Sequence, residues 1–269
     1  LSSGSIANLG EARAMPGELK FHTLDMCADG LAALAAMRPP DLVYQLAVLP
    51  SGRPAEESAG ASLRGVAAAL EVARQFPGSK VVVAVKASLL YGEVPAREQP
   101  LKESQAWKPV GVGGVVTRSV LDLLATYRER HAVEFTALAM PSVYGPRQRP
   151  EAGVVAAFAA ALRDGSAPTV HGDGRQTRDF LFVDDAVDAL VRAAHKGSGL
   201  VVNTGTGVAT SINDLWEAMA GSSALAPVYT PKRVESVQRL SLAGTRARIQ
   251  LAWAPWTDLA TGLRSLDRA

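Results

Sequence analysis

Apolar and polar positions follow two different patterns along this chain of 269 residues. In the first half, apolar runs of strand length alternate with longer segments that carry a single apolar face, as helices do. The run at Lys80–Ala87 is rich in β-branched residues, which is typical of a strand buried in a parallel sheet. This alternation predicts a doubly wound α/β fold, with a parallel Rossmann-like sheet over residues 1–150. The expected strands are Leu19–Leu24, Asp41–Val48, Lys80–Ala87 and Val133–Ala139, and the expected long helices are Ala55–Gln75 and Val112–His131.

The pattern becomes less regular after Pro150. A second, smaller domain is therefore expected at residues 151–269, and its segment 199–207 is expected to return to the large sheet. Ser211 and Asp214 have the spacing of a capping box at the start of a helix. The expected elements are helices at Val154–Arg163, Asp184–His195 and Ile212–Ala220, a strand at Gly199–Asn203, and short strands and turns within 169–183.

The segment His171–Asp185, with the sequence HGDGRQTRDFLFVDD, concentrates candidate chemistry. Its two glycines favour a tight turn, because glycine adopts positive φ readily. Arg178 follows this turn, and a fixed guanidinium can donate two charge-assisted hydrogen bonds to a phosphate. The alternative is an ordinary loop in which an arginine pairs with Asp173 or Asp179. Asp184–Asp185 are expected to cap the helix that follows.

Composition and charge narrow the class of protein. Apolar residues make up 48% of the chain and charged residues 20%, as in a soluble globular protein. A formal net charge of +2 is too small to indicate nucleic acid or a membrane surface as a partner. The single Cys27 excludes an internal disulfide, and with four scattered histidines it argues against a metal site. Without a bilayer-spanning run or a signal peptide, a cytoplasmic protein is expected.

Further motifs surround this segment. They are LYGE at Leu90–Glu93, PSVYGP at Pro141–Pro146, VNTGTG at Val202–Gly207 and LAWAP at Leu251–Pro255. Together and in this order they resemble the extended short-chain dehydrogenases/reductases, in the nucleotide-sugar epimerase and dehydratase family of the UDP-glucose 4-epimerase type. The resemblance implies a Rossmann-like domain with a smaller substrate domain, NAD(P) as cofactor and a UDP- or dTDP-linked sugar as ligand. It also implies a homodimer formed through the helices at 55–75 and 112–131.

The chain departs from the family pattern at its beginning. Family members open with a strand, a Gly-x-x-Gly-x-x-Gly turn and a helix, whose backbone amides hold the dinucleotide pyrophosphate. Leu1–Gly4 aligns after the second strand of that pattern, so the first βαβ unit is expected to be missing. Either the natural protein is longer or this member has decayed. Gly111–Gly114 follows a loop, and Gly205–Gly207 resembles a turn joining the two domains, so neither is expected to replace the phosphate turn.

The catalytic positions of the family also differ here. In the family, a tyrosine takes the proton of a sugar hydroxyl, a lysine four residues on lowers the pKa of that tyrosine, and a serine or threonine binds the same oxygen. These positions fall on Val110, Gly114 and Ala87, and none of these side chains can transfer a proton. Lys86 and Ser88 are expected to point away from the face of Ala87 and to miss the pocket.

Ligand-binding positions are better preserved. Arg178 matches the family arginine that grips the diphosphate, and Arg233 matches a second one. His171 lies where a side chain commonly packs against the base, although a histidine bonded within the turn is an equal alternative. Ser142 replaces the asparagine that contacts the sugar.

Positions that contact the cofactor in the family fall on Asp25, after the first expected strand, and on Ser62, where the family has asparagine. Tyr91 and Tyr144 are interpreted as packing residues. Three hypotheses follow. The chain is a family member that binds a nucleotide sugar but is catalytically impaired or silent, an active epimerase or dehydratase with an atypical acid or base, or a non-catalytic partner subunit.

Overall fold

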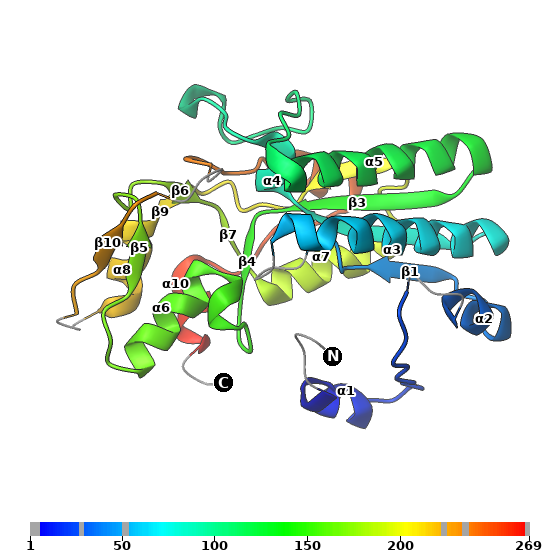
Figure 1. Ribbon diagram of the computed structural model, residues 1–269, viewed down its shortest axis with the longest axis horizontal. Helices are drawn as coiled ribbons and strands as arrows, with labels where there is room; N and C mark the ends of the chain where they lie inside the picture. The colour runs from blue at the N-terminus through cyan, green and yellow to red at the C-terminus, as the bar shows by residue number, and fades with distance from the viewer. Residues whose placement is uncertain (1–5, 27–29, 50–53, 222–224, 233–236, 267–269) are drawn as a thin grey trace.

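The computed structural model of the chain describes residues 6–26, 30–49, 54–221, 225–232 and 237–266. A four-stranded parallel sheet forms its centre (Figure 1). This sheet confirms the predicted α/β fold class with a Rossmann-like parallel sheet. In the order in which they lie side by side, its strands are β1 (Leu42–Gln45), β2 (Lys80–Lys86), β3 (Glu134–Met140) and β8 (Leu200–Asn203).

Helices cover both faces of the sheet, as in a doubly wound fold. Successive side chains of a strand point to opposite faces, so each strand contributes to two apolar clusters. Val83 of β2 lies in the cluster with the first pair of helices, and Val82 lies in the cluster with the second pair. The first pair is α3 (Ala55–Gln75) and α5 (Gly111–His131), and the second is α7 (Val183–His195) and α9 (Thr245–Gln250).

A smaller region adjoins the carboxyl ends of the sheet strands, on the left of Figure 1. Its core is aromatic: Tyr144 packs edge-on against Phe180 and Phe182, and Phe158 packs edge-on against Trp216. Three strand pairs support this core, one of them antiparallel. The elements are β4 (Ser142–Tyr144) paired with β7 (Phe180–Phe182), β5 (Thr169–His171) with β10 (Val228–Thr230), β6 (Thr177–Arg178) with β9 (Thr210–Ser211), and helices α6 (Val154–Arg163), α8 (Ile212–Ala220) and α10 (Leu259–Arg264).

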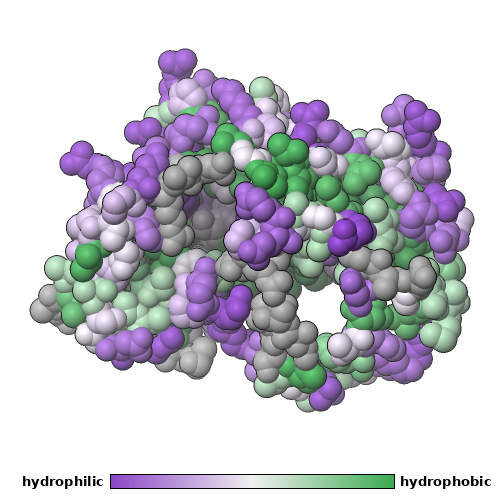
Figure 2. Space-filling model, in the orientation of Figure 1, coloured by the Kyte–Doolittle hydropathy of each residue, from purple (hydrophilic) through white to green (hydrophobic). Residues whose placement is uncertain are grey.

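Residues 6–26 contain no strand, so the prediction of a strand at Leu19–Leu24 is wrong. A strand needs a neighbour for its backbone N–H and C=O groups, and this segment runs apart from β1 (Figure 1). Figure 2 shows an opening between this segment and the rest of the molecule. Leu19 and Phe21 are consequently exposed. The elements here are η1 (Ile6–Leu9), α1 (Gly10–Ala14) and α2 (Gly30–Met37).

The predicted helix boundaries agree with the structure for α3, α6 and α8, and the capping box of Ser211 and Asp214 is present. The expected cap of α7 is wrong, because Phe182 is its N-cap and both aspartates lie inside the first turn. Asp185 instead accepts hydrogen bonds from the backbone N–H groups of Trp256 and Thr257. Within the described ranges, every helix is too short or too polar to cross a membrane.

Candidate functional site

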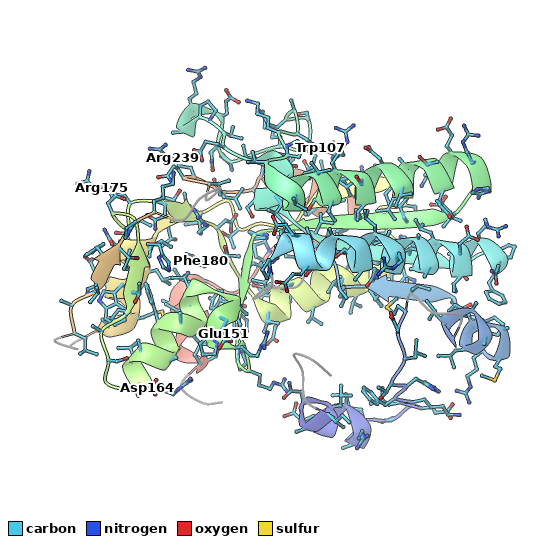
Figure 3. The ribbon with its side chains drawn as sticks, in the orientation of Figure 1. Trp107, Glu151, Asp164, Arg175, Phe180 and Arg239 are labelled. Carbon is cyan, nitrogen blue, oxygen red and sulfur yellow. The ribbon has the colours of Figure 1, made fainter. Side chains whose placement is uncertain are left out.

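A cleft of about 660 Å³ opens at the carboxyl ends of β1, β2 and β3, where they meet the smaller region. Ligands of open α/β sheets bind in this place, because the loops that follow the strands converge there. Figure 3 shows Phe180, the first residue of β7 and one of the lining residues, close to α6. The polar side chains that line the cleft belong to Lys86, Ser88, Ser142, Tyr144, Gln148 and Arg178, and the other lining residues are apolar or glycine.

Arg178 brings a positive charge into this cleft. It lies on β6 and its Nη1 donates a hydrogen bond to the backbone oxygen of Thr177 at 2.8 Å. Burial lowers the pKa of the guanidinium, and the nearby charge of Glu93 opposes that shift. The ordinary pKa of arginine is so high that the group stays charged at neutral pH. A cation in an apolar cleft favours an anionic ligand.

Lys86 also lines the cleft, and the expectation that it misses the pocket is wrong. Val82 lies on the α7 face of the sheet, so Lys86, four residues further along β2, shares that face. The cleft opens at this end of the strand. Burial lowers the pKa of the Lys86 ammonium. Ala87 points the other way and is fully buried in the cluster with α3 and α5.

Ser88 lines the cleft as well, which again differs from the sequence expectation. The strand ends at Lys86 and the helix α4 (Ala87–Tyr91) begins, so the alternation of a strand no longer sets the direction of Ser88. Ser88 also lines a second hollow of about 360 Å³. The two hollows therefore adjoin at this residue.

The positions at which the resemblance expects the family tyrosine and lysine lie beside this second hollow. Val110 lines it, is 47% exposed and forms the N-cap of α5. Gly114 is buried one turn later, and a Cβ atom there would lie 2.8 Å from the carbonyl carbon of Pro109. The backbone is therefore packed for glycine at position 114. With Ala87 in the core, none of the three positions offers a group that can transfer a proton.

The nearby tyrosines have packing roles. The hydroxyl of Tyr91 donates to Oδ1 of Asn203 at 2.8 Å, and burial raises the pKa of Tyr91 to about 12. Tyr144 lines the cleft, but its hydroxyl donates to the backbone oxygen of Leu259 at 3.4 Å. Burial raises the pKa of this tyrosine too. Neither hydroxyl is prepared to lose a proton near neutral pH.

Asp179 holds together several segments behind the cleft, a role that the sequence analysis missed. Its buried carboxylate accepts hydrogen bonds from Thr206 N at 3.0 Å, Thr206 Oγ1 at 2.7 Å, Gly207 N at 3.1 Å and Leu242 N at 3.0 Å. Its backbone oxygen accepts from Ser142 N at 3.0 Å. Burial raises the pKa of Asp179, and the hydrogen bonds oppose the shift. The sequence suggested only pairing with a neighbouring arginine, because these partners are distant along the chain.

Ser142 and Arg178 are thus brought together in the cleft, whereas His171 does not line it. His171 ends β5, with its Nδ1 2.8 Å from Oγ1 of Thr230. The predicted turn follows, with positive φ at Gly172 and Gly174. Arg175, beyond this turn, lies at the outer edge of the view in Figure 3.

Other predicted ligand positions lie elsewhere. Ser62 supports the cleft from behind, because its Oγ accepts from Leu49 N at 3.0 Å and donates to Ser58 O at 2.8 Å, and Leu49 lines the cleft. Asp25 is exposed on the N-terminal segment. Arg233 lies outside the described residues, as does Cys27. Among the residues with a described position, no cluster of metal-ligating side chains was found.

Neither glycine run is arranged as a dinucleotide phosphate turn. The N–H groups of Thr206 and Gly207 are bonded to the carboxylate of Asp179 rather than directed at a ligand. Gly113 and Gly114 instead allow α5 to pack closely, against Leu89 and Pro109. Neither of these two runs therefore fits the pyrophosphate of a dinucleotide.

Comparison with known proteins agrees with this architecture. Residues 5–205 match the family described as "NAD dependent epimerase/dehydratase family". A UDP-glucose 4-epimerase from Mycolicibacterium smegmatis is 36% identical over 274 residues, which cover 98% of this chain and 86% of that protein. The crystal structure of a Thermotoga maritima UDP-glucose 4-epimerase with UDP-glucose superposes with a TM-score of 0.92 at 29% identity, over 100% of this chain and 87% of that one. The crystal structure of a Thermus thermophilus UDP-glucose 4-epimerase in complex with NAD superposes with a TM-score of 0.86 at 26% identity, over 99% of this chain and 87% of that one.

Proposed function

The chain belongs to the NAD dependent epimerase/dehydratase family, and we propose that it binds a UDP- or dTDP-linked sugar in the cleft but is catalytically impaired. One observation carries the binding proposal: Arg178 places a half-buried guanidinium in a cleft that has no acidic lining residue among those described. A guanidinium can hold a diphosphate through two charge-assisted hydrogen bonds. The relatives named above act on or bind UDP-glucose, which supports this class of ligand.

The impairment follows from the three family positions. Oxidation of a sugar hydroxyl removes a hydride from the carbon that bears it and a proton from its oxygen, so it requires a group that accepts this proton, and Ala87, Val110 and Gly114 provide none. A positioned acid or base contributes roughly 10²–10⁴ in rate. In this chain the remaining residues of the cleft would bind and orient the sugar nucleotide without the usual proton transfer.

NAD(P) is the cofactor that the family implies, and in family members it accepts hydride from the sugar. Neither Gly111–Gly114 nor Gly205–Gly207 offers it a phosphate turn, because both runs are engaged in packing and internal hydrogen bonds. Binding of NAD(P) by this chain is a proposal with a direct test, which is titration of the protein with NAD⁺ followed by calorimetry.

Arg178→Ala tests the binding proposal, with Arg175→Ala as the matched control from the exposed side of the same segment. Millimolar UDP-glucose or dTDP-glucose is expected to raise the melting temperature of the wild-type protein. Loss of a charged hydrogen-bond partner weakens binding by about ten- to hundredfold, so Arg178→Ala is expected to remove the shift and Arg175→Ala to keep it. No shift with the wild-type protein would refute binding, and NAD-dependent epimerisation that Arg178→Ala abolishes would refute the impairment.

A homodimer through α3 and α5 is also proposed. The two helices lie side by side on one face of the sheet (Figure 1), and Val112 and Val115 on the outer side of α5 are exposed. An apolar outer face of this kind is buried when two copies pair. Sedimentation is expected to give a dimer that Val115→Glu dissociates; a monomeric wild-type protein would refute it.

A further inference from the structure

Resting on the proposed function, we propose that Lys86 makes this cleft selective for a nucleotide sugar whose sugar carries a carboxylate, that is, a nucleotide-diphosphate hexuronate. Two cations line the cleft, Lys86 from the sheet and Arg178 from the smaller region, while the lining residues include no acid among the described part of the chain. A diphosphate held by Arg178 leaves the second cation for another anionic group.

The place of Lys86 identifies where that second group lies. Lys86 is the last residue of β2, where the cleft opens, and β2 pairs with the strand that leads to Ser142, the position at which the resemblance places a contact with the sugar. In the sheet it is in register with Met140 of β3, two residues before Ser142, and both of these also line the cleft. Lys86 therefore lies at the sugar end of the cleft rather than at the diphosphate end.

The ammonium of Lys86 makes no hydrogen bond or ion pair with the residues whose positions are described. Burial without a partner disfavours its charged form. Such a lysine costs stability unless a ligand provides the opposite charge, which is typical of a binding residue. A sugar carboxylate provides a full negative charge, whereas the hydroxymethyl group of a neutral hexose does not.

The test compares UDP-glucuronate with UDP-glucose by calorimetry on wild-type protein, Lys86→Met and Lys102→Met. Methionine keeps the length of the side chain without the charge, and Lys102 is an exposed lysine outside both hollows. The wild-type protein and Lys102→Met are expected to bind UDP-glucuronate about ten- to hundredfold more tightly than UDP-glucose. Lys86→Met is expected to lose this preference and to bind UDP-glucose as the wild-type protein does.

Several results would overturn the inference. Equal affinity of the wild-type protein for the two sugars would refute selectivity and leave the proposed function intact. Equal weakening of both by Lys86→Met would assign Lys86 to the diphosphate instead. Failure of both sugars to bind a folded wild-type protein would refute the proposed function itself. If Lys86→Met does not fold, as judged by circular dichroism, Lys86→Gln serves for the same comparison.

Discussion

Two walls of the site, one in the cleft and one in the hollow that adjoins it at Ser88, differ in the chemistry of their side chains. The wall formed by the smaller region carries Arg178, with Asp179 behind it fixed by four hydrogen bonds. The wall near α5 borders the adjoining hollow, with Val110 at its surface and Ala87 and Gly114 buried beside it, and the resemblance expects proton-transferring groups at these positions. Under the proposed function, one wall carries the charge that holds a ligand, and the other lacks the groups that would transform it.

In each wall, the surrounding residues are packed for the side chain that the chain has there. Gly114 is matched by the backbone of Pro109, which leaves no room for a lysine stem. Asp179 is matched by distant N–H groups that converge on its carboxylate. A binding wall with a connected hydrogen-bond network and a second wall packed for small residues support binding without turnover.

Asp179→Ala is expected to lower the stability of the protein more than any other change, and it tests the wall that carries Arg178. Three backbone N–H groups and one hydroxyl lose their buried acceptor, and each unsatisfied group costs about 1–3 kcal/mol. The free energy of unfolding, measured with urea, is expected to fall by about 3 kcal/mol or more. Asp173→Ala is the control, since Asp173 accepts one backbone N–H in an exposed turn and its loss is expected to matter much less.

Gly174→Ala tests how strictly the turn on the Arg178 wall is built. Gly174 has φ of 75°, and an added Cβ would lie 1.8 Å from Oδ1 of Asn213. Strain and overlap together are expected to lower the free energy of unfolding by about 2–3 kcal/mol. Gly165→Ala has similar φ with open space around it and is expected to cost about 1 kcal/mol. If urea unfolding shows that both variants lose the same free energy of unfolding, the Asn213 side chain moves aside without cost.

Introducing a tyrosine at position 110 and a lysine at position 114, as the family pattern has them, tests the wall near α5. Gly114→Lys is expected to lower the free energy of unfolding by about 1–3 kcal/mol, because its Cβ overlaps Pro109. Val110→Tyr, at a half-exposed position, is expected to stay within about 0.5 kcal/mol of the wild-type protein. The double variant is expected to show no NAD-dependent turnover of UDP-glucose. A stable double variant that epimerises UDP-glucose would contradict the view that the packing of this wall excludes a working tyrosine–lysine pair.

Lys86→Met is expected to have a small effect in the opposite direction and to raise the free energy of unfolding by less than about 1 kcal/mol at pH 7. Burial lowers the pKa of Lys86 in the folded protein, so the unfolded chain binds more protons between that lowered value and the ordinary lysine pKa of about 10.4. The stability of the wild-type protein relative to Lys86→Met is therefore expected to rise as the pH increases through this range. Urea unfolding at pH 7 and pH 10 measures it, and a variant that is less stable at pH 7 would contradict it.

Local sequence determined a large part of this molecule. The helices α3, α6 and α8 begin and end where the apolar periodicity and caps predict, because those signals act within a few residues. The turn glycines Gly172 and Gly174 were predictable for the same reason. The family motifs also identified Arg178 and Ser142 as cleft residues, since the order of the motifs encodes the fold.

Tertiary structure alone decided the rest. A strand at Leu19–Leu24 depends on a neighbour to pair with, which its own residues do not provide. Lys86 lines the cleft because the cleft opens on the α7 face of β2. Ser88 lines it because α4 begins at Ala87, a boundary that the apolar run Lys80–Ala87 does not reveal. The role of Asp179 comes from partners brought together by folding across long stretches of chain. Side-chain direction at the end of an element, and hydrogen bonds between remote segments, are set by packing in three dimensions.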